Sequence, residues 1–171
     1  MVALLLLLAA FLAGAFLPAG PPEVDQEAEV PAVVLVSEAG RQEGVQRSAC
    51  VGGPASGYCI DAAAPVEPEE LSVVRPGETV EIALEGELDG TGVLVVRVLG
   101  CGQEAASVPL ESPAPWTVDL EPGAYALEVF YEFEGEGLSG DTSVALGLLV
   151  DRAEPAVIVP IDSTVRACPD G

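Results

Sequence analysis

Carboxylates are the side chains in this sequence with the greatest capacity for chemistry. The chain has 28 Asp and Glu residues, six Arg, no Lys and no His. The missing residue types exclude a Ser-His-Asp triad, a Cys-His pair, a His-ligated metal and a Schiff-base lysine. Carboxylates by themselves can hydrolyse glycosides or bind hard cations. The candidate chemistry is therefore carboxylate catalysis, cation binding or recognition driven by charge.

Two segments combine carboxylates with glycines, as calcium-binding loops do. One is Asp89-Gly-Thr-Gly92 and the other spans residues 134–141. Neither has the spacing of an EF-hand loop. We therefore expect no cofactor, and keep as the alternative a calcium ion bound by residues from the set Asp89, Glu134, Glu136 and Asp141.

Catalytic motifs are weak in this chain. Asp141-Thr-Ser and Asp162-Ser-Thr resemble the Asp-Thr/Ser-Gly of aspartic proteases but lack its glycine. There is no GxGxxG fingerprint and no P-loop. We predict a protein that is not an enzyme, with no catalytic residues, and keep a carboxylate-dependent hydrolase as the weaker alternative.

The formal net charge of −22 limits the partners of this protein. A field of this sign repels nucleic-acid phosphates and anionic membrane surfaces. Divalent cations and basic proteins are attracted instead. We therefore expect no nucleic acid and no anionic membrane as partner, and basic proteins or divalent cations as the candidates.

The N-terminus predicts export. Residues 4–12 form an apolar h-region, and Ala13-Gly14-Ala15 matches an A-x-A cleavage site, so we expect a signal peptide over residues 1–15, or up to residue 20. The alternative is an uncleaved membrane anchor, since the run approaches the ~20 residues of a membrane span. Both alternatives place the domain outside the cytoplasm, secreted or in the cell envelope.

Four cysteines follow the apolar run, namely Cys50, Cys59, Cys101 and Cys168. An even number in an exported domain predicts two disulfides with three possible connectivities. Among these we favour Cys50–Cys59 and Cys101–Cys168, because a turn-rich loop can bring the first two together.

The strands that the sequence predicts must position all these residues. Residues 16–29 are expected to be a flexible lead-in, residues 30–151 the folded domain, and residues 152–171 a tail with a possible edge strand over 157–161. Alternating apolar residues predict half-buried strands over 79–85, 114–120, 125–131 and 144–150, and a more hydrophobic central strand over 93–99. Asp89-Gly90 predicts a hairpin turn, and residues 41–50 are expected to return along a first strand over 30–36.

These patterns predict an all-β fold, an immunoglobulin-like antiparallel β-sandwich, with a small β-barrel as the alternative. The segment from Leu120 to Tyr125 has the form of a tyrosine corner, in which the Tyr hydroxyl bonds a nearby carbonyl.

Residues 33–150 resemble an uncharacterised family of small exported bacterial β-sandwich proteins. The matching residues are Ser48-Ala-Cys50, Cys59-Ile-Asp61 and the Leu-x-Pro-Gly-x-Tyr corner at residues 120–125. Ala49 and Val51 stand where the family has aromatic residues. The resemblance implies the Cys50–Cys59 pairing and implies no activity. We expect an exported binding or structural module, with a calcium-binding domain as the alternative.

Overall fold

The computed structural model describes residues 29–161 apart from 54–55, 63–66, 136 and 153–155. The predicted signal peptide, nearly all of the predicted lead-in and the end of the C-terminal tail lie outside the described residues. Among the described residues, no helix has the length and hydrophobicity to cross a bilayer.

The described residues form twelve strands. They are β1 (Val33–Ser37), β2 (Gly40–Glu43), β3 (Val45–Gly52), β4 (Gly57–Asp61), β5 (Glu70–Val74), β6 (Thr79–Leu84), β7 (Asp89–Val98), β8 (Glu104–Ser112), β9 (Ala114–Thr117), β10 (Gly123–Gly135), β11 (Leu138–Val150) and β12 (Ile158–Pro160).

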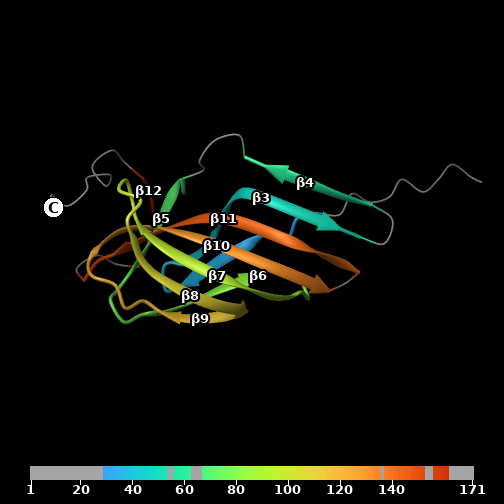
Figure 1. Cartoon of the computed structure of the whole chain (residues 1–171). Helices are drawn as coiled ribbons and strands as arrows, with labels where there is room; N and C mark the ends of the chain where they lie inside the picture. The colour runs from blue at the N-terminus through green and yellow to red at the C-terminus, as the bar shows by residue number, and fades with distance from the viewer. Residues whose placement is uncertain (1–28, 54–55, 63–66, 136, 153–155, 162–171) are drawn as a thin grey trace, which may run out of the picture.

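The strands form two packed sheets (Figure 1). The small sheet has the order β2-β1-β6-β9, and the large sheet has the order β12-β5-β11-β10-β7-β8. The hairpin β3–β4 joins the large sheet through β11, beside the place where β5 pairs with the same strand. All pairs are antiparallel except β5–β11. The predicted all-β sandwich is confirmed, and the described strands do not close into the alternative barrel.

Apolar side chains at every second position of the strands fill the space between the two sheets. In β6 the side chains of Val80, Ile82 and Leu84 are buried, as predicted. In β10 every second side chain is buried, from Tyr125 to Phe133. Alternation gives each strand one apolar side, and burying those sides together drives the packing.

The predicted hairpin at Asp89-Gly90 is wrong. β6 and β7 belong to different sheets, and both residues already lie within β7, paired with β10. The chain turns earlier, at Gly86, whose φ of 93° suits glycine. Gly90 is needed for close packing instead, because a Cβ there would lie 2.4 Å from Leu84 Cδ1.

The predicted single return strand over residues 41–50 is also wrong. The chain leaves the small sheet after β2 and enters the large sheet at β3, and Gly44 at the crossing donates its amide to Val33 O. A buried polar contact joins the two sheets near this point. Ser72 Oγ in β5 donates to Gln42 Oε1 in β2 at 2.9 Å, and Gln42 Nε2 donates to Glu70 O.

The tyrosine corner is confirmed. The Tyr125 hydroxyl donates to Glu121 O at 2.8 Å. Burial, together with the charge of Glu121, raises the pKa of the Tyr125 phenol. The expected edge strand in the tail is β12, which pairs with β5 at the end of the large sheet.

Candidate functional site

The outward side of the large sheet carries the carboxylates that the sequence singles out. Since alternate side chains of β10 point into the core, Glu128, Phe130, Glu132 and Glu134 point outward. Strand register places Asp89 of β7 directly across from Glu134 and Asp141 of β11 directly across from Glu132.

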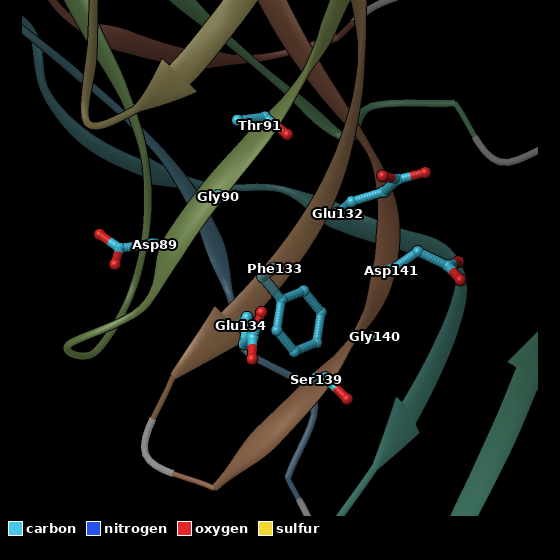
Figure 2. Close-up of a pocket in the computed structure, with 9 residues that line it drawn as sticks. All are labelled: Asp89, Gly90, Thr91, Glu132, Phe133, Glu134, Ser139, Gly140 and Asp141. Carbon is cyan, nitrogen blue, oxygen red and sulfur yellow. The ribbon is translucent and has the colours of Figure 1, made fainter.

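Four carboxylates line one shallow depression of about 530 Å³, and Figure 2 shows the Asp89 carboxylate directed away from those of Glu132 and Asp141. They are Asp89, Glu132, Glu134 and Asp141, and Thr91 and Ser139 add hydroxyls to the same surface. We call these four carboxylates the acidic face. They rise from three neighbouring strands, so the rigid sheet fixes their spacing.

The predicted calcium candidates are thus partly brought together. Asp89, Glu134 and Asp141 line the same depression, and Glu136 lies outside the described residues. The prediction that these residues lie in loops is wrong, because Asp89, Glu134 and Asp141 are strand residues. Among the described residues, no three Asp, Glu, Cys or His side chains are placed to hold a metal ion.

The acidic face lacks cationic partners within the described part of the chain. Arg41 pairs with Glu85 and Arg75 with Glu38, both away from this surface. Like charges directly across from each other on neighbouring strands destabilise a sheet. The acidic face therefore holds negative charge that no ion pair of the described residues offsets.

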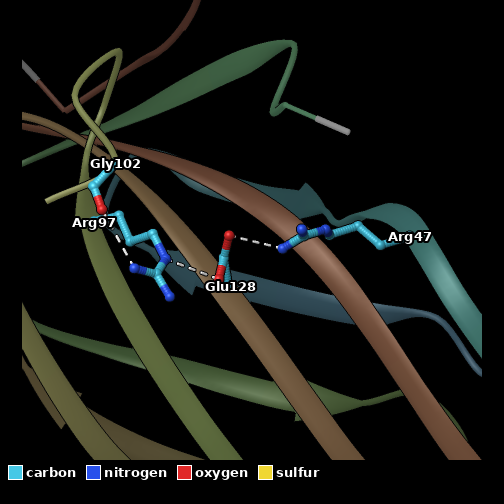
Figure 3. A network of polar contacts seen from close by, with 4 residues as sticks. All are labelled: Arg47, Arg97, Gly102 and Glu128. Carbon is cyan, nitrogen blue, oxygen red and sulfur yellow. Dashed lines mark hydrogen bonds and ion pairs between the residues drawn. The ribbon is translucent and has the colours of Figure 1, made fainter. Parts of the chain in front are cut away.

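One carboxylate on the same side of the sheet is fully partnered. Glu128 of β10 lies 2.8 Å from Arg47 Nη1 and 3.0 Å from Arg97 Nε (Figure 3). Burial alone would raise the pKa of the Glu128 carboxyl, but the hydrogen bonds and charges of the two arginines together lower it below its ordinary value. The hydrogen bond and charge of Glu128 in turn raise the pKa of Arg97. This triad ties β3 and β7 to β10.

An apolar row borders the acidic face. Phe130 is 36% exposed and lies directly across from Val93, which in turn lies across from Pro109 of β8. The sequence motifs singled out neither Glu132 nor Phe130. The signal for both was the alternation of β10, which puts Phe130 on the polar side between Glu128 and Glu132.

The Cys50–Cys59 disulfide is confirmed and lies in the same cross-strand row as Asp141. Cys50 of β3 pairs with Asp141 on one side and with Cys59 of β4 on the other. The bond is consistent with an extracytoplasmic location. None of the described cysteines is free, and Cys168, the predicted partner of Cys101, lies outside the described residues.

Comparison with known proteins adds no relative to this picture. The sequence matches no family model and no curated protein. What the acidic face can do therefore follows from its own geometry and charge: two cross-strand pairs of carboxylates lie beside an exposed aromatic ring.

Proposed function

We propose that the chain is an extracytoplasmic, non-enzymatic binding module that recognises basic segments of other proteins with its acidic face. One observation carries the proposal: four carboxylates form two pairs, each directly across neighbouring strands, and no ion pair of the described residues offsets them. Negative charge needed only for solubility has no reason to gather in this way, since repulsion disfavours it.

The spacing of these carboxylates suits separate cationic side chains better than one metal ion. Calcium needs six to eight oxygens at roughly 2.3–2.6 Å from one point. Residues 132 and 134 on one strand are spaced by about 7 Å. Side chains on one side of an extended polypeptide repeat at the same interval, so successive Lys or Arg residues can each reach a carboxylate.

Phe130 and Val93 support a polypeptide ligand. A Lys or Arg that reaches Glu132 passes its aliphatic stem over this apolar row, and its charge can lie against the Phe130 ring. Such a contact would contribute about 0.5–1 kcal/mol at an exposed site. A free metal ion would gain nothing from this row.

Three features support an extracytoplasmic location. They are the hydrophobic N-terminal segment, the even number of cysteines and the Cys50–Cys59 bond. An open surface on the side of a sheet, in place of carboxylates on two walls of a cleft, supports binding over glycoside hydrolysis.

The test is calorimetric titration with a basic probe. The probe is an acetylated and amidated peptide of alternating lysine and valine, about ten residues long so that it can run along one strand in extended form. We expect saturable binding to the wild-type protein. Calcium chloride is titrated in parallel, and we expect no saturable heat from it.

Two variants with equal charge changes locate the site. The first neutralises the acidic face with Asp89→Asn, Glu132→Gln, Glu134→Gln and Asp141→Asn. The control neutralises four exposed carboxylates elsewhere with Glu43→Gln, Glu69→Gln, Glu81→Gln and Glu121→Gln. Loss of peptide binding in the first variant alone supports the proposal. Equal loss in both would reduce the interaction to net charge, and saturable calcium binding in place of peptide binding would overturn it.

A further inference from the structure

The carboxylates of the acidic face lie on strands in the interior of the large sheet. β7 pairs with β8 and β10, β10 pairs with β7 and β11, and the part of β11 that carries Asp141 pairs with β10 and β3. Each of these strands thus has a neighbour on both sides. A ligand that contacts the carboxylates must therefore lie over the outward side chains of the sheet, and the order of those side chains decides what the ligand meets.

Outward residues of β10 define rows that run across the sheet and differ in chemistry. The acidic face fills two successive rows, one around Glu134 and one around Glu132. The next row is the apolar row, in which Phe130 lies across from Val93, and Val93 lies across from Pro109. Successive rows are about 7 Å apart, which is also the interval at which an extended chain presents alternate side chains. An extended ligand that lies along β10 can therefore place one side chain on each row.

The row beyond the apolar row holds a carboxylate that is already paired. Glu128 Oε1 lies 2.8 Å from Arg47 Nη1, and Glu128 Oε2 lies 3.0 Å from Arg97 Nε (Figure 3). A basic side chain of a ligand would meet two guanidinium charges there, and like charges repel. The outward side of β10 is therefore asymmetric, because two acidic rows lie on one side of the apolar row and a neutralised carboxylate lies on the other.

The apolar row favours a different kind of side chain from the acidic rows. Phe130 is 36% exposed, and covering its ring with an apolar side chain removes apolar area from water. Val93 is half-buried beside it, and Pro109 is exposed. An apolar side chain of the ligand therefore gains most on this row, whereas basic side chains gain most on the two acidic rows.

We propose that the acidic face and the apolar row together bind an extended basic segment with a defined order: an apolar residue two positions outside a pair of basic residues that are themselves two positions apart. The apolar side chain packs on Phe130 and Val93, and the basic side chains face Glu132 and Glu134. This inference rests on the proposed function for the charge of the ligand and adds the place of its apolar residue. Charge complementarity selects a basic polypeptide, because a second copy would bring another −22 charge to the same surface. Contacts through side chains alone leave the chain direction open, so the apolar residue can precede or follow the basic pair.

Three acetylated and amidated peptides of identical composition and charge test this order. In the aligned peptide, Thr-Leu-Thr-Lys-Thr-Lys-Thr, the leucine shares one side of the extended chain with both lysines. The shifted peptide, Thr-Thr-Leu-Lys-Thr-Lys-Thr, keeps the lysine spacing but turns the leucine to the opposite side. The central peptide, Thr-Lys-Thr-Leu-Thr-Lys-Thr, has the leucine between the lysines, so a leucine on Phe130 brings one lysine to the row of Glu128.

NMR titrations of isotope-labelled protein at low ionic strength measure the three affinities. We expect the aligned peptide to bind wild-type protein more tightly than either of the others by about threefold or more, because only this peptide matches all three rows. Equal binding of the aligned and shifted peptides would overturn the inference, since these two differ only in the side to which the leucine points.

Variants of the apolar row assign the preference to its residues. Phe130→Thr keeps a strand-forming residue and removes the ring, so the aligned and shifted peptides should bind it equally. Val93→Thr changes the side-chain volume little, should reduce the preference in the same direction, and serves if the first variant unfolds. Val36→Thr replaces an exposed valine of the small sheet and should leave the preference unchanged. A preference of wild-type size in either apolar-row variant, shown to be folded by its thermal melt, would overturn the inference.

These outcomes separate the two proposals. If all three peptides bind wild-type protein equally and the acidic-face variant loses them all, the order of residues is not recognised while the proposed function stands. If no basic peptide binds the wild-type protein, the proposed function fails, and the ordered segment fails with it.

Discussion

Glu128 and Glu132 lie on the same side of β10, yet only Glu128 has cationic partners among the described residues. Arg47 and Arg97 contact Glu128, whereas no arginine in the described part of the chain forms an ion pair with the four carboxylates of the acidic face. Both regions share the same strands and the same rigid core. The triad therefore contributes to stability, whereas the acidic face makes no comparable contribution, as we expect of a surface that binds a ligand.

Neutralising the acidic face should have the largest effect on binding and almost none on stability. The four-carboxylate variant should lose about a hundredfold in affinity for the lysine–valine peptide, if each exposed pair contributes about 0.7 kcal/mol. Its melting temperature should stay equal to the wild-type value or rise slightly, because like charges across neighbouring strands are removed. Calorimetry and thermal melts check both. A large fall in melting temperature would contradict the claim that the acidic face does not stabilise the fold.

Salt should weaken peptide binding by a smaller factor. Raising ionic strength from about 0.05 to 0.5 M should lower affinity roughly tenfold, because exposed pairs are screened. Peptide titrations at several salt concentrations measure this slope. Affinity that is independent of salt would mean that the apolar row, and not the carboxylates, holds the peptide.

Removing the charge of Glu128 should have the opposite effect to neutralising the acidic face: stability should fall and peptide affinity should not change. Glu128→Gln breaks both contacts of the triad, and the melting temperature should fall by roughly 2–4 °C. Peptide affinity should not change, since Glu128 is already neutralised by Arg47 and Arg97. Melting curves and the same titration test this. A variant that binds the peptide more weakly, with unchanged stability, would place Glu128 in the binding surface.

The pH dependence of this difference in stability is a finer test. Since the folded-state pKa of Glu128 lies below the ordinary 4.5, its stabilising effect is complete above that value and is lost as pH falls through the folded-state pKa. The difference in melting temperature between wild type and Glu128→Gln should therefore be constant near neutral pH. It should disappear in acid, at pH values below the folded-state pKa of Glu128. A difference that grows on acidification would contradict the assigned direction.

Calcium should have the smallest effect. The acidic face does not gather the oxygens that calcium needs, so millimolar calcium or a chelator should move the melting temperature by less than about 1 °C. Melts in both conditions measure this. A rise of several degrees with calcium, lost in the acidic-face variant, would identify a metal site instead.

Sequence periodicity predicts the half-buried strands because successive side chains of a strand point to opposite sides of the sheet. In β6 and in β10, apolar residues stand at every second position, and these positions are the buried ones. The Tyr125 corner and the Cys50–Cys59 bond are predictable for a related reason, since the partners in each contact lie close together in the chain.

The strands that were missed lack the clear alternation that marks the others. β5 is buried without alternation because it lies in the interior of the large sheet, parallel to β11, and β8 contains Pro109, which an edge strand tolerates. The Asp89-Gly90 hairpin failed because Gly90 allows close packing and not a turn. The acidic face was only partly predicted, since register alone places Asp89 beside Glu134 and Asp141 beside Glu132.

A backbone NMR titration tests the central claim most directly. Isotope-labelled protein is titrated with the lysine–valine peptide, and shifts of the amide signals are mapped on the two sheets. The account predicts that the largest shifts fall on β7, β10 and β11 around Asp89, Glu132, Glu134 and Asp141, with little change around Glu128 or in the small sheet. Shifts centred on the small sheet, or none at saturating peptide, would contradict it.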